Sequence, residues 1–175
     1  MTDSVGNPPA GSGHEPDESG GTAQSAKGRT AKRKLGLRVE RVHTTAGVHP
    51  YDEVRWERRD VVMTNWRDGS VNFEQRGVAF PDFWSANATN IVTSKYFRGA
   101  VGSPQREHSL RQLIDRVVTT YTNAGLQHGY FASETDAEIF NHELTWMLLH
   151  QVFSFNSPVW FNVGTNSPQQ VSACF

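Results

Sequence analysis

Apolar side chains recur every three or four positions in two stretches of the second half of the chain, and this period predicts two amphipathic helices. The first is expected to begin at Ser103-Pro104, a capping hydroxyl followed by proline, and to end at residues 123–125, Asn-Ala-Gly. The second is expected to open with Thr135 and Glu138 as a capping box. The apolar faces comprise Leu110, Leu113, Ile114, Val117, Val118 and Tyr121, and then Ile139, Phe140, Leu144, Met147, Leu148 and Val152. Helices of this kind are expected to pack as an antiparallel pair.

A two-residue period predicts strands in the first half of the chain. Leu37, Val39 and Val42 alternate with charged residues, which predicts a half-buried strand. Residues 60–66 and 70–76 flank Arg67-Asp68-Gly69, and Asp-Gly favours a hairpin turn because glycine accepts a positive φ. Three aromatic side chains are expected to anchor the buried face of this hairpin: Trp56, Trp66 and Phe73. Residues 91–97 could form a strand or a helix, and we favour a helix.

The first 34 residues consist mainly of small, polar and charged side chains. Burial cannot offset the entropy of ordering such a segment, so residues 1–34 are predicted to be a disordered tail. A basic cluster closes it and could contact a nucleic acid or an acidic partner, although we interpret it as a solvated linker: Lys27, Arg29, Lys32, Arg33 and Lys34. Residues 35–172 are predicted to form one mainly helical α+β domain with a β-hairpin.

Composition and charge narrow the class of protein. The 175 residues carry a formal net charge of -1, so no global field attracts the chain to nucleic acid or to an anionic membrane. No apolar run reaches the roughly 18 residues that cross a bilayer, and the N-terminus lacks the order of a signal peptide. We therefore expect a cytoplasmic protein without a membrane partner. The single cysteine, Cys174, excludes an internal disulfide framework and a thiolate-built zinc site.

The seven histidines raise the question of a metal site. His142-Glu143 is followed by His150 eight residues later, whereas the His-Glu-x-x-His motif of zinc proteins places the second imidazole one turn along the helix. On a helix the two imidazoles would lie about 12 Å apart at ~1.5 Å per residue. We therefore predict no metal site here and interpret both histidines as polar-face or packing residues.

The residues before Cys174 are the strongest candidates for chemistry. Residues 156–173 are crowded with hydroxyl and amide side chains next to a helix end. Such a loop suits oxygen-rich, anionic ligands, because hydroxyls and free backbone N–H groups bind phosphate and ribose oxygens. A lone buried cysteine is usually a small hydrophobe, so the role of Cys174 depends on this context.

Four short sequence motifs occur in order along residues 53–175. They are Arg59-Asp60-Val61-Val62, Ser85-Ala86-Asn87 through Lys95-Tyr96-Phe97-Arg98-Gly99, Asn156-Ser157-Pro158-Val159-Trp160-Phe161-Asn162, and Ser172-Ala173-Cys174-Phe175. Together they resemble the N-terminal part of the adenosylcobalamin-dependent (class II) ribonucleotide reductases. The resemblance is specific because several motifs occur in the same order, whereas Ser-Ala-Cys alone would be a weak signal.

The resemblance implies a role for three residues. Cys174 would lie on the first strand of a ten-stranded α/β barrel that begins at residues 173–175, and it would be one of two thiols that reduce the ribose. Ser157 and Ala173 match positions that contact the substrate nucleotide, Ala173 through its backbone. The implied partners are a nucleoside diphosphate substrate, nucleotide effectors, a thioredoxin-like reductant and further copies of the full-length chain.

The same resemblance implies that the chain is a fragment. The radical cysteine, the second redox cysteine and the contacts to adenosylcobalamin lie further along the family's chain, so this polypeptide alone is expected to be inactive. Without the missing barrel, apolar surface should be exposed along one stretch and should cause aggregation: Phe153, Phe155, Val159, Trp160 and Phe161.

Two other interpretations stay open on the residues alone. A non-catalytic helical interaction module with a basic disordered arm explains the periodicity equally well. Its weakness is the end of the sequence at Ala173-Cys174-Phe175, which resembles the start of a buried strand. A free-standing thiol protein ranks last, because Cys174 has no Cys-x-x-Cys partner and no following helix start to lower its pKa.

Overall fold

The computed structural model describes residues 36–173 and shows an α+β arrangement, as predicted. The predictions for residues 1–35, for Cys174 and for Phe175 lie outside the described residues. The elements, in chain order, are the 3-10 turn η1 (Pro50–Asp52), β1 (Trp56–Thr64), β2 (Val71–Pro81), α1 (Ala86–Ile91), the π-helical turn η2 (Val92–Tyr96), α2 (Leu110–Gln127), α3 (Glu134–Leu149) and α4 (Ser157–Asn162). The strand that would open an α/β barrel stays a prediction.

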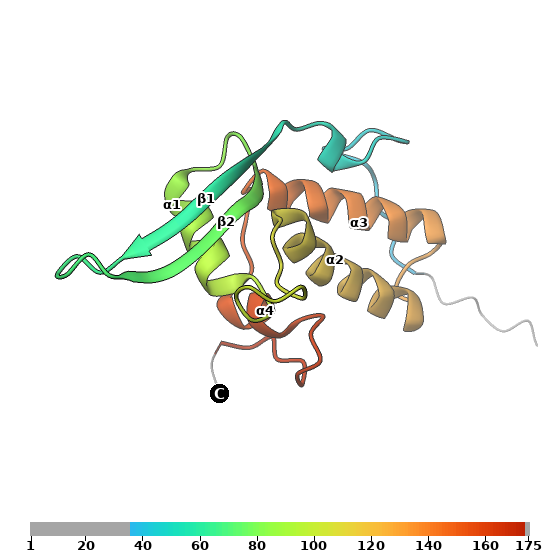
Figure 1. Ribbon diagram of the computed structural model, residues 1–175. Coiled ribbons are helices and arrows are strands. Elements are labelled where there is room, and N and C mark those ends of the chain that lie inside the picture. Colours follow the sequence, from blue (N-terminus) through green and yellow to red (C-terminus); the bar gives the residue numbers. More distant parts are fainter. Residues whose placement is uncertain (1–35, 174–175) are drawn as a thin grey trace, which may run out of the picture. The chain divides into compact units, whose positions relative to one another are not determined.

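The predicted antiparallel helix pair is confirmed: α2 and α3 lie side by side with opposite directions (Figure 1). The predicted start of the first helix is wrong. Ser109, and not Ser103, caps α2, and its Oγ accepts the N–H of Arg111 at 3.2 Å. The segment before the cap is held along β2, because the carbonyl of His108 accepts the N–H of Ala79 at 2.9 Å. The helix also continues beyond residue 125, to Gln127.

The second helix is capped by a hydroxyl residue, but the cap differs from the predicted one. Ser133 is the N-cap of α3, and its Oγ accepts the N–H of Asp136 at 3.1 Å. Asp136 also accepts the hydroxyl of Ser133 at 2.5 Å, and this pair stands two residues before the expected pair of Thr135 and Glu138. The helix ends at Leu149, and Val152 lies beyond it, 57% exposed.

The hairpin is confirmed and is longer than predicted. β1 and β2 pair in antiparallel register from Trp56 opposite Pro81 to Thr64 opposite Val71. Gly69 has a φ of 73° in the turn, as the Asp-Gly motif predicts. Trp66 was expected to face the core, but it is 85% exposed. It lies beyond the last strand pair, where the Arg67 guanidinium is 5.0 Å from its ring centroid.

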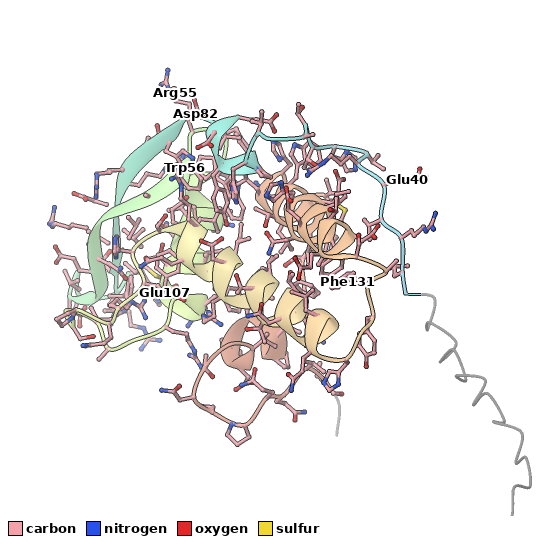
Figure 2. The ribbon with its side chains drawn as sticks, turned by 90° about the vertical axis from the view of Figure 1, so that its right-hand side faces the viewer. Glu40, Arg55, Trp56, Asp82, Glu107 and Phe131 are labelled. Carbon is pink, nitrogen blue, oxygen red and sulfur yellow. The ribbon has the colours of Figure 1, made fainter. Side chains whose placement is uncertain are left out.

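The hydrophobic core forms where the base of the hairpin meets the helices. Phe80 of β2 stacks on Phe97 with ring centroids 5.8 Å apart, and both are almost fully buried. In Figure 1 the turn of the hairpin is the part farthest from α2 and α3, so only its base is covered by helices. At that base Arg55 and Asp82 form an exposed ion pair of 3.3 Å (Figure 2). Buried members of the core include Val61, Val78, Phe80, Phe97, Leu110, Leu113, Ile114, Val117, Leu149 and Trp160.

The half-buried strand predicted around residues 37–42 is not formed. Leu37 makes a single bridge to Phe131, and Val42 is 76% exposed. The backbone N–H groups of this segment bind carboxylates of α3: Val39 donates to Asp136 at 2.9 Å, and residues 42–44 donate to Glu143. Because side chains on a helix accept these N–H groups, the segment does not need hydrogen bonds from a neighbouring strand. Its alternation of apolar and charged residues therefore does not indicate a face of a sheet.

The helical interpretation of residues 91–97 is confirmed. Ser85 caps α1, with its Oγ accepting the N–H of Ala88 at 3.1 Å, and η2 continues the helix to Tyr96. The expected apolar surface after α3 is only partly present. Val159 and Trp160 are buried, while Phe153 is 38% exposed. No helix between residues 36 and 173 combines the length and the apolar character that crossing a bilayer requires.

Gly125 provides a test of packing between α2 and the loop that follows it. An added Cβ at this buried position would overlap the ring of Phe131, which packs at a tilt against Phe140 with centroids 5.2 Å apart. Alanine normally stabilises a helix interior by about 1 kcal/mol relative to glycine, whereas overpacking costs about 1–3 kcal/mol. We expect Gly125→Ala to lower the free energy of unfolding by about 1 kcal/mol, measured by urea denaturation. A gain in stability would show that the ring of Phe131 moves away at no cost.

Candidate functional site

Ser157 is the first residue of α4, and the residue before it links two parts of the predicted site. Asn156 caps the helix, with its Oδ1 accepting the N–H of Val159 at 3.3 Å. Its Nδ2 donates to the carbonyl of Val171 at 3.0 Å. Pro158 follows inside the first turn, where a missing N–H costs nothing. The segment that leads to Ala173 is thereby joined to the start of α4, 15 residues earlier in the sequence.

Ser157 is exposed, and its hydroxyl has one partner among residues 36–173. Its Oγ lies 3.1 Å from the hydroxyl of Tyr96, on η2, and either group can be the donor. The Tyr96 ring contacts Phe161 with centroids 5.3 Å apart, and the Arg98 guanidinium lies 5.7 Å from the centroid of Phe161. A hydroxyl pair with aromatic and cationic neighbours can accept and donate hydrogen bonds to a polar ligand.

A buried ion pair positions α4 against the rest of the fold. Arg116 of α2 and Glu107 are 2.7 Å apart, and their side chains are only 11% and 10% exposed. Arg116 also donates to the carbonyls of Val163 at 2.7 Å and Trp160 at 3.1 Å, at the end of α4. Glu107 accepts the N–H of Arg98 at 2.8 Å (Figure 2 labels Glu107). One guanidinium therefore holds α4 to α2 and to the segment that follows η2.

A second arginine, Arg106, binds backbone carbonyls of η2 and of the segment after it. It donates to the carbonyls of Thr93 at 2.6 Å and Gly99 at 3.1 Å, and also to that of Phe97. Burial lowers the pKa of this guanidinium, and the neighbouring charge of Arg98 acts in the same direction. Since an arginine keeps its charge under all ordinary conditions, the effect of this site is to fix backbone carbonyls rather than to move a proton.

The loop between α4 and Ala173 is closed by one glutamine. The Oε1 of Gln169 accepts the N–H of Gly164 at 2.9 Å, and its Nε2 donates to the carbonyls of Ser167 at 2.9 Å and Thr165 at 3.0 Å. Beyond it Val171 and Ala173 are exposed. The backbone of Ala173, which the resemblance implies as a substrate contact, is thus reachable from solvent in this chain.

His142 and His150, the two histidines considered above as metal ligands, take part in ring packing along α3 and at its C-terminal end. The ring of His150 stacks on Trp146 with centroids 4.0 Å apart, and His142 contacts His49 edge to face at 5.0 Å. Burial, and then the charges of His49 and Arg41, lower the pKa of His142. Its Nδ1 lies 3.3 Å from the Arg41 guanidinium, which can only donate, so the imidazole accepts here. Within residues 36–173 no three His, Cys, Asp or Glu side chains gather as metal ligands would.

Two of the three residues implied by the resemblance are described, and the structure adds others. Ser157 and Ala173 belong to segments that Asn156 connects, while Cys174 lies outside the described residues. Neither the capping role of Asn156 nor the bonds from Arg116 to the α4 region were predicted from the sequence. The Asn-Ser-Pro order predicts a helix start by itself, since asparagine is a preferred cap and proline a preferred first residue. No local signal marks Arg116, because its partners are distant in sequence.

The comparisons with known proteins define the class of protein. Residues 58–151 match the family described as class II vitamin B12-dependent ribonucleotide reductase, and the chain belongs to this family. It is similar to the vitamin B12-dependent ribonucleotide reductase of Streptomyces coelicolor, with 76% identity over 155 residues, which cover 89% of this chain and 16% of the relative.

More distant relatives carry the same name. The vitamin B12-dependent ribonucleotide reductase of Rhodopirellula baltica is 44% identical over 126 residues, covering 71% of this chain and 12% of the relative. That of Bradyrhizobium diazoefficiens is 33% identical over 161 residues, covering 73% of this chain and 13% of the relative. The chain therefore spans less than a fifth of the length of these curated relatives.

The described residues do not fit the cofactor in the family's name. An apolar cavity with a volume of about 390 Å³ lies between α1, α2 and α4, and most of the side chains that line it are aromatic or aliphatic. No histidine and no charged side chain of residues 36–173 lines it. A corrin ring with its amide-bearing periphery and axial nucleotide needs a larger site with many polar contacts.

Proposed function

We propose that this chain is the N-terminal part of an adenosylcobalamin-dependent ribonucleoside-diphosphate reductase that makes deoxyribonucleotides for DNA synthesis. The observation that carries the proposal is the 76% identity to a vitamin B12-dependent ribonucleotide reductase over nearly all of the chain. Adenosylcobalamin would be bound by the rest of the full-length protein and would supply the radical chemistry. The chain alone is then inactive. Deoxynucleotide synthesis also supports a location in the cytoplasm.

Cys174 is assigned to the reducing step. Two thiols each lose a hydrogen and join as a disulfide, the 2′ carbon of the ribose exchanges its C–O bond for a C–H bond, and the oxygen leaves as water. Two electrons pass from sulfur to the sugar, so the disulfide must be reopened by an external dithiol, for which a thioredoxin-like protein is suited. The second thiol belongs to the part of the full-length protein beyond this chain.

Ser157 and Ala173 are assigned to substrate binding. The exposed Ser157 hydroxyl, which pairs with Tyr96 at 3.1 Å and with no other side chain of the described part of the chain, can offer a hydrogen bond to a ribose or phosphate oxygen. The exposed backbone near Ala173 is tied to the same region through Asn156 and Val171. The full-length protein would also bind nucleotide effectors and assemble with further copies of itself.

The test replaces Cys174 by serine in the full-length protein. We expect deoxynucleotide formation with a dithiol reductant to fall by about a thousandfold or more, because a hydroxyl cannot form a disulfide. Ser167→Ala, in the exposed loop before Cys174, serves as the matched control and should keep its activity. Product is measured by chromatography of the nucleosides. Full activity of the Cys174→Ser protein would contradict the assignment. A full-length protein that makes no deoxynucleotide at all would favour the interaction module.

A further inference from the structure

Gln151 occupies a backbone position that normally belongs to glycine. Its φ is 57°, and it is the one residue other than glycine with a positive φ among residues 36–173. It follows the end of α3, where its N–H donates to the carbonyl of Leu148 at 3.2 Å and the N–H of Val152 donates to that of Met147 at 2.9 Å. This pair of bonds forms the C-terminal motif in which glycine avoids the strain of the left-handed conformation. A strained residue kept in place of glycine points to a use for its side chain.

Gln151 is one of the residues that line the apolar cavity, and it is itself exposed. The cavity, about 390 Å³, falls in the range of small-molecule sites, and Trp84, Trp160 and Tyr96 supply aromatic walls. The two indole N–H groups are already satisfied: Trp84 donates to the carbonyl of Leu149 at 2.8 Å and Trp160 to Ser154 at 3.1 Å. Neither indole N–H group is therefore free to donate to a ligand in the cavity. The Gln151 amide, by contrast, has no hydrogen-bond partner among residues 36–173.

These features select a class of ligand. No charged side chain within the described residues lines the cavity, so a phosphate has no partner inside it. Aromatic faces favour a planar ring, and an amide pairs through its donor and its acceptor with the edge of a heterocycle, as glutamine does with adenine. We propose that the cavity binds a nucleobase whose edge is read by the amide of Gln151. This inference rests on the proposed function in one respect: a ribonucleotide reductase works among nucleotides, so such a ligand is available.

The binding test uses the 175-residue chain and two free bases, adenine and uracil. Binding is followed by NMR titration after a sharp thermal transition has established that each variant is folded. Indole, a planar ring without an amide-like edge, is the reference ligand. We expect the base to shift signals of Trp84 and Trp160, and we expect Gln151→Ala to weaken its binding about tenfold, the loss of one to two hydrogen bonds, while indole binding is unchanged.

A second variant separates the strain from the amide. Gln151→Gly should weaken base binding as much as Gln151→Ala, but it should also raise the melting temperature by about 3–5 °C, because glycine relieves the positive φ. The proposal is overturned if neither base binds at millimolar concentration, if both variants bind the base as tightly as the parent chain, or if the cavity signals depend on protein concentration, which would show that a second copy fills it. None of these outcomes depends on ribonucleotide reduction, so they are distinct from a failure of the Cys174 experiment.

Discussion

Replacing Arg116 by methionine is expected to lower the free energy of unfolding by about 3–5 kcal/mol. The substitution keeps most of the side-chain volume but leaves the carboxylate of Glu107, 10% exposed, without its cationic partner. It also removes the donors to the carbonyls of Trp160 and Val163. Urea denaturation of the parent and variant chains measures the loss, with the slope of the transition used to check that unfolding stays cooperative.

A double variant provides the control for this prediction. Glu107→Gln keeps an oxygen that can accept the N–H of Arg98, but it removes the buried charge. Combined with Arg116→Met, it should recover more than half of the lost stability, because the largest part of the cost is an unpaired buried charge rather than the missing contacts. A loss below 1 kcal/mol in the single variant would mean that water reaches Glu107 and that the pair contributes no more than an exposed one.

The second large effect is expected at Glu143, which holds the segment around residues 42–44. Its side chain accepts the N–H groups of Val42, His43 and Thr44 at 2.9–3.1 Å and the hydroxyl of Thr44 at 2.6 Å. In Glu143→Gln one acceptor oxygen becomes an NH₂ group that faces a donor. We expect a loss of about 1–3 kcal/mol at pH 7, measured by urea denaturation. Glu138→Gln is the matched control on the same helix, because Glu138 makes only an exposed ion pair with Arg41 and should cost under about 1 kcal/mol.

The effect of Glu143 should depend on pH in a definite direction. Burial by itself raises the pKa of this carboxyl, but the hydrogen bonds from Thr44, His43 and Val42 outweigh it and hold the pKa below its usual value. A group with a depressed pKa in the folded state stabilises the protein above its unfolded pKa, and this contribution is lost as the pH falls through the folded pKa. The difference between the parent chain and Glu143→Gln should therefore shrink as the pH is lowered below about 4.5. A difference that stays constant down to pH 3 would contradict this origin.

The sequence predicted the elements whose signals are local. The periodicity of α2 and α3, the Asp-Gly turn at Gly69 and the helical character around Tyr96 all rest on neighbours within a few residues, and each is present. The predictions were wrong where a residue distant in sequence determines the local structure. Ser103-Pro104 has the order of a helix start, but the pairing of His108 with Ala79 delays the helix to Leu110. The alternation from Leu37 to Val42 resembles a strand, but the carboxylates of α3 bind its backbone.

The residues of the candidate site show the same difference between local and distant signals. Ser157 and Ala173 could be predicted as site residues because the motifs that contain them resemble those of a known family. The groups that position them could not, because Arg116 reaches residues more than forty positions away and Tyr96 meets Ser157 across 61 positions. Gln151 was also overlooked. A glutamine after a helix carries no mark of its backbone conformation, and only the structure reveals the positive φ and the cavity beside it.

The contacts of Arg116 have a consequence for the order in which the chain acquires its structure. The carbonyls that it binds on α4 are made by the ribosome after α2, α3 and the hairpin are complete. The short helix has only six residues, too few to be stable in isolation, so it can persist only once the guanidinium is already in place to receive it. We therefore expect the region around Ser157 to be the last of the described elements to become ordered during synthesis. Its position would be determined by contacts with elements that have already folded.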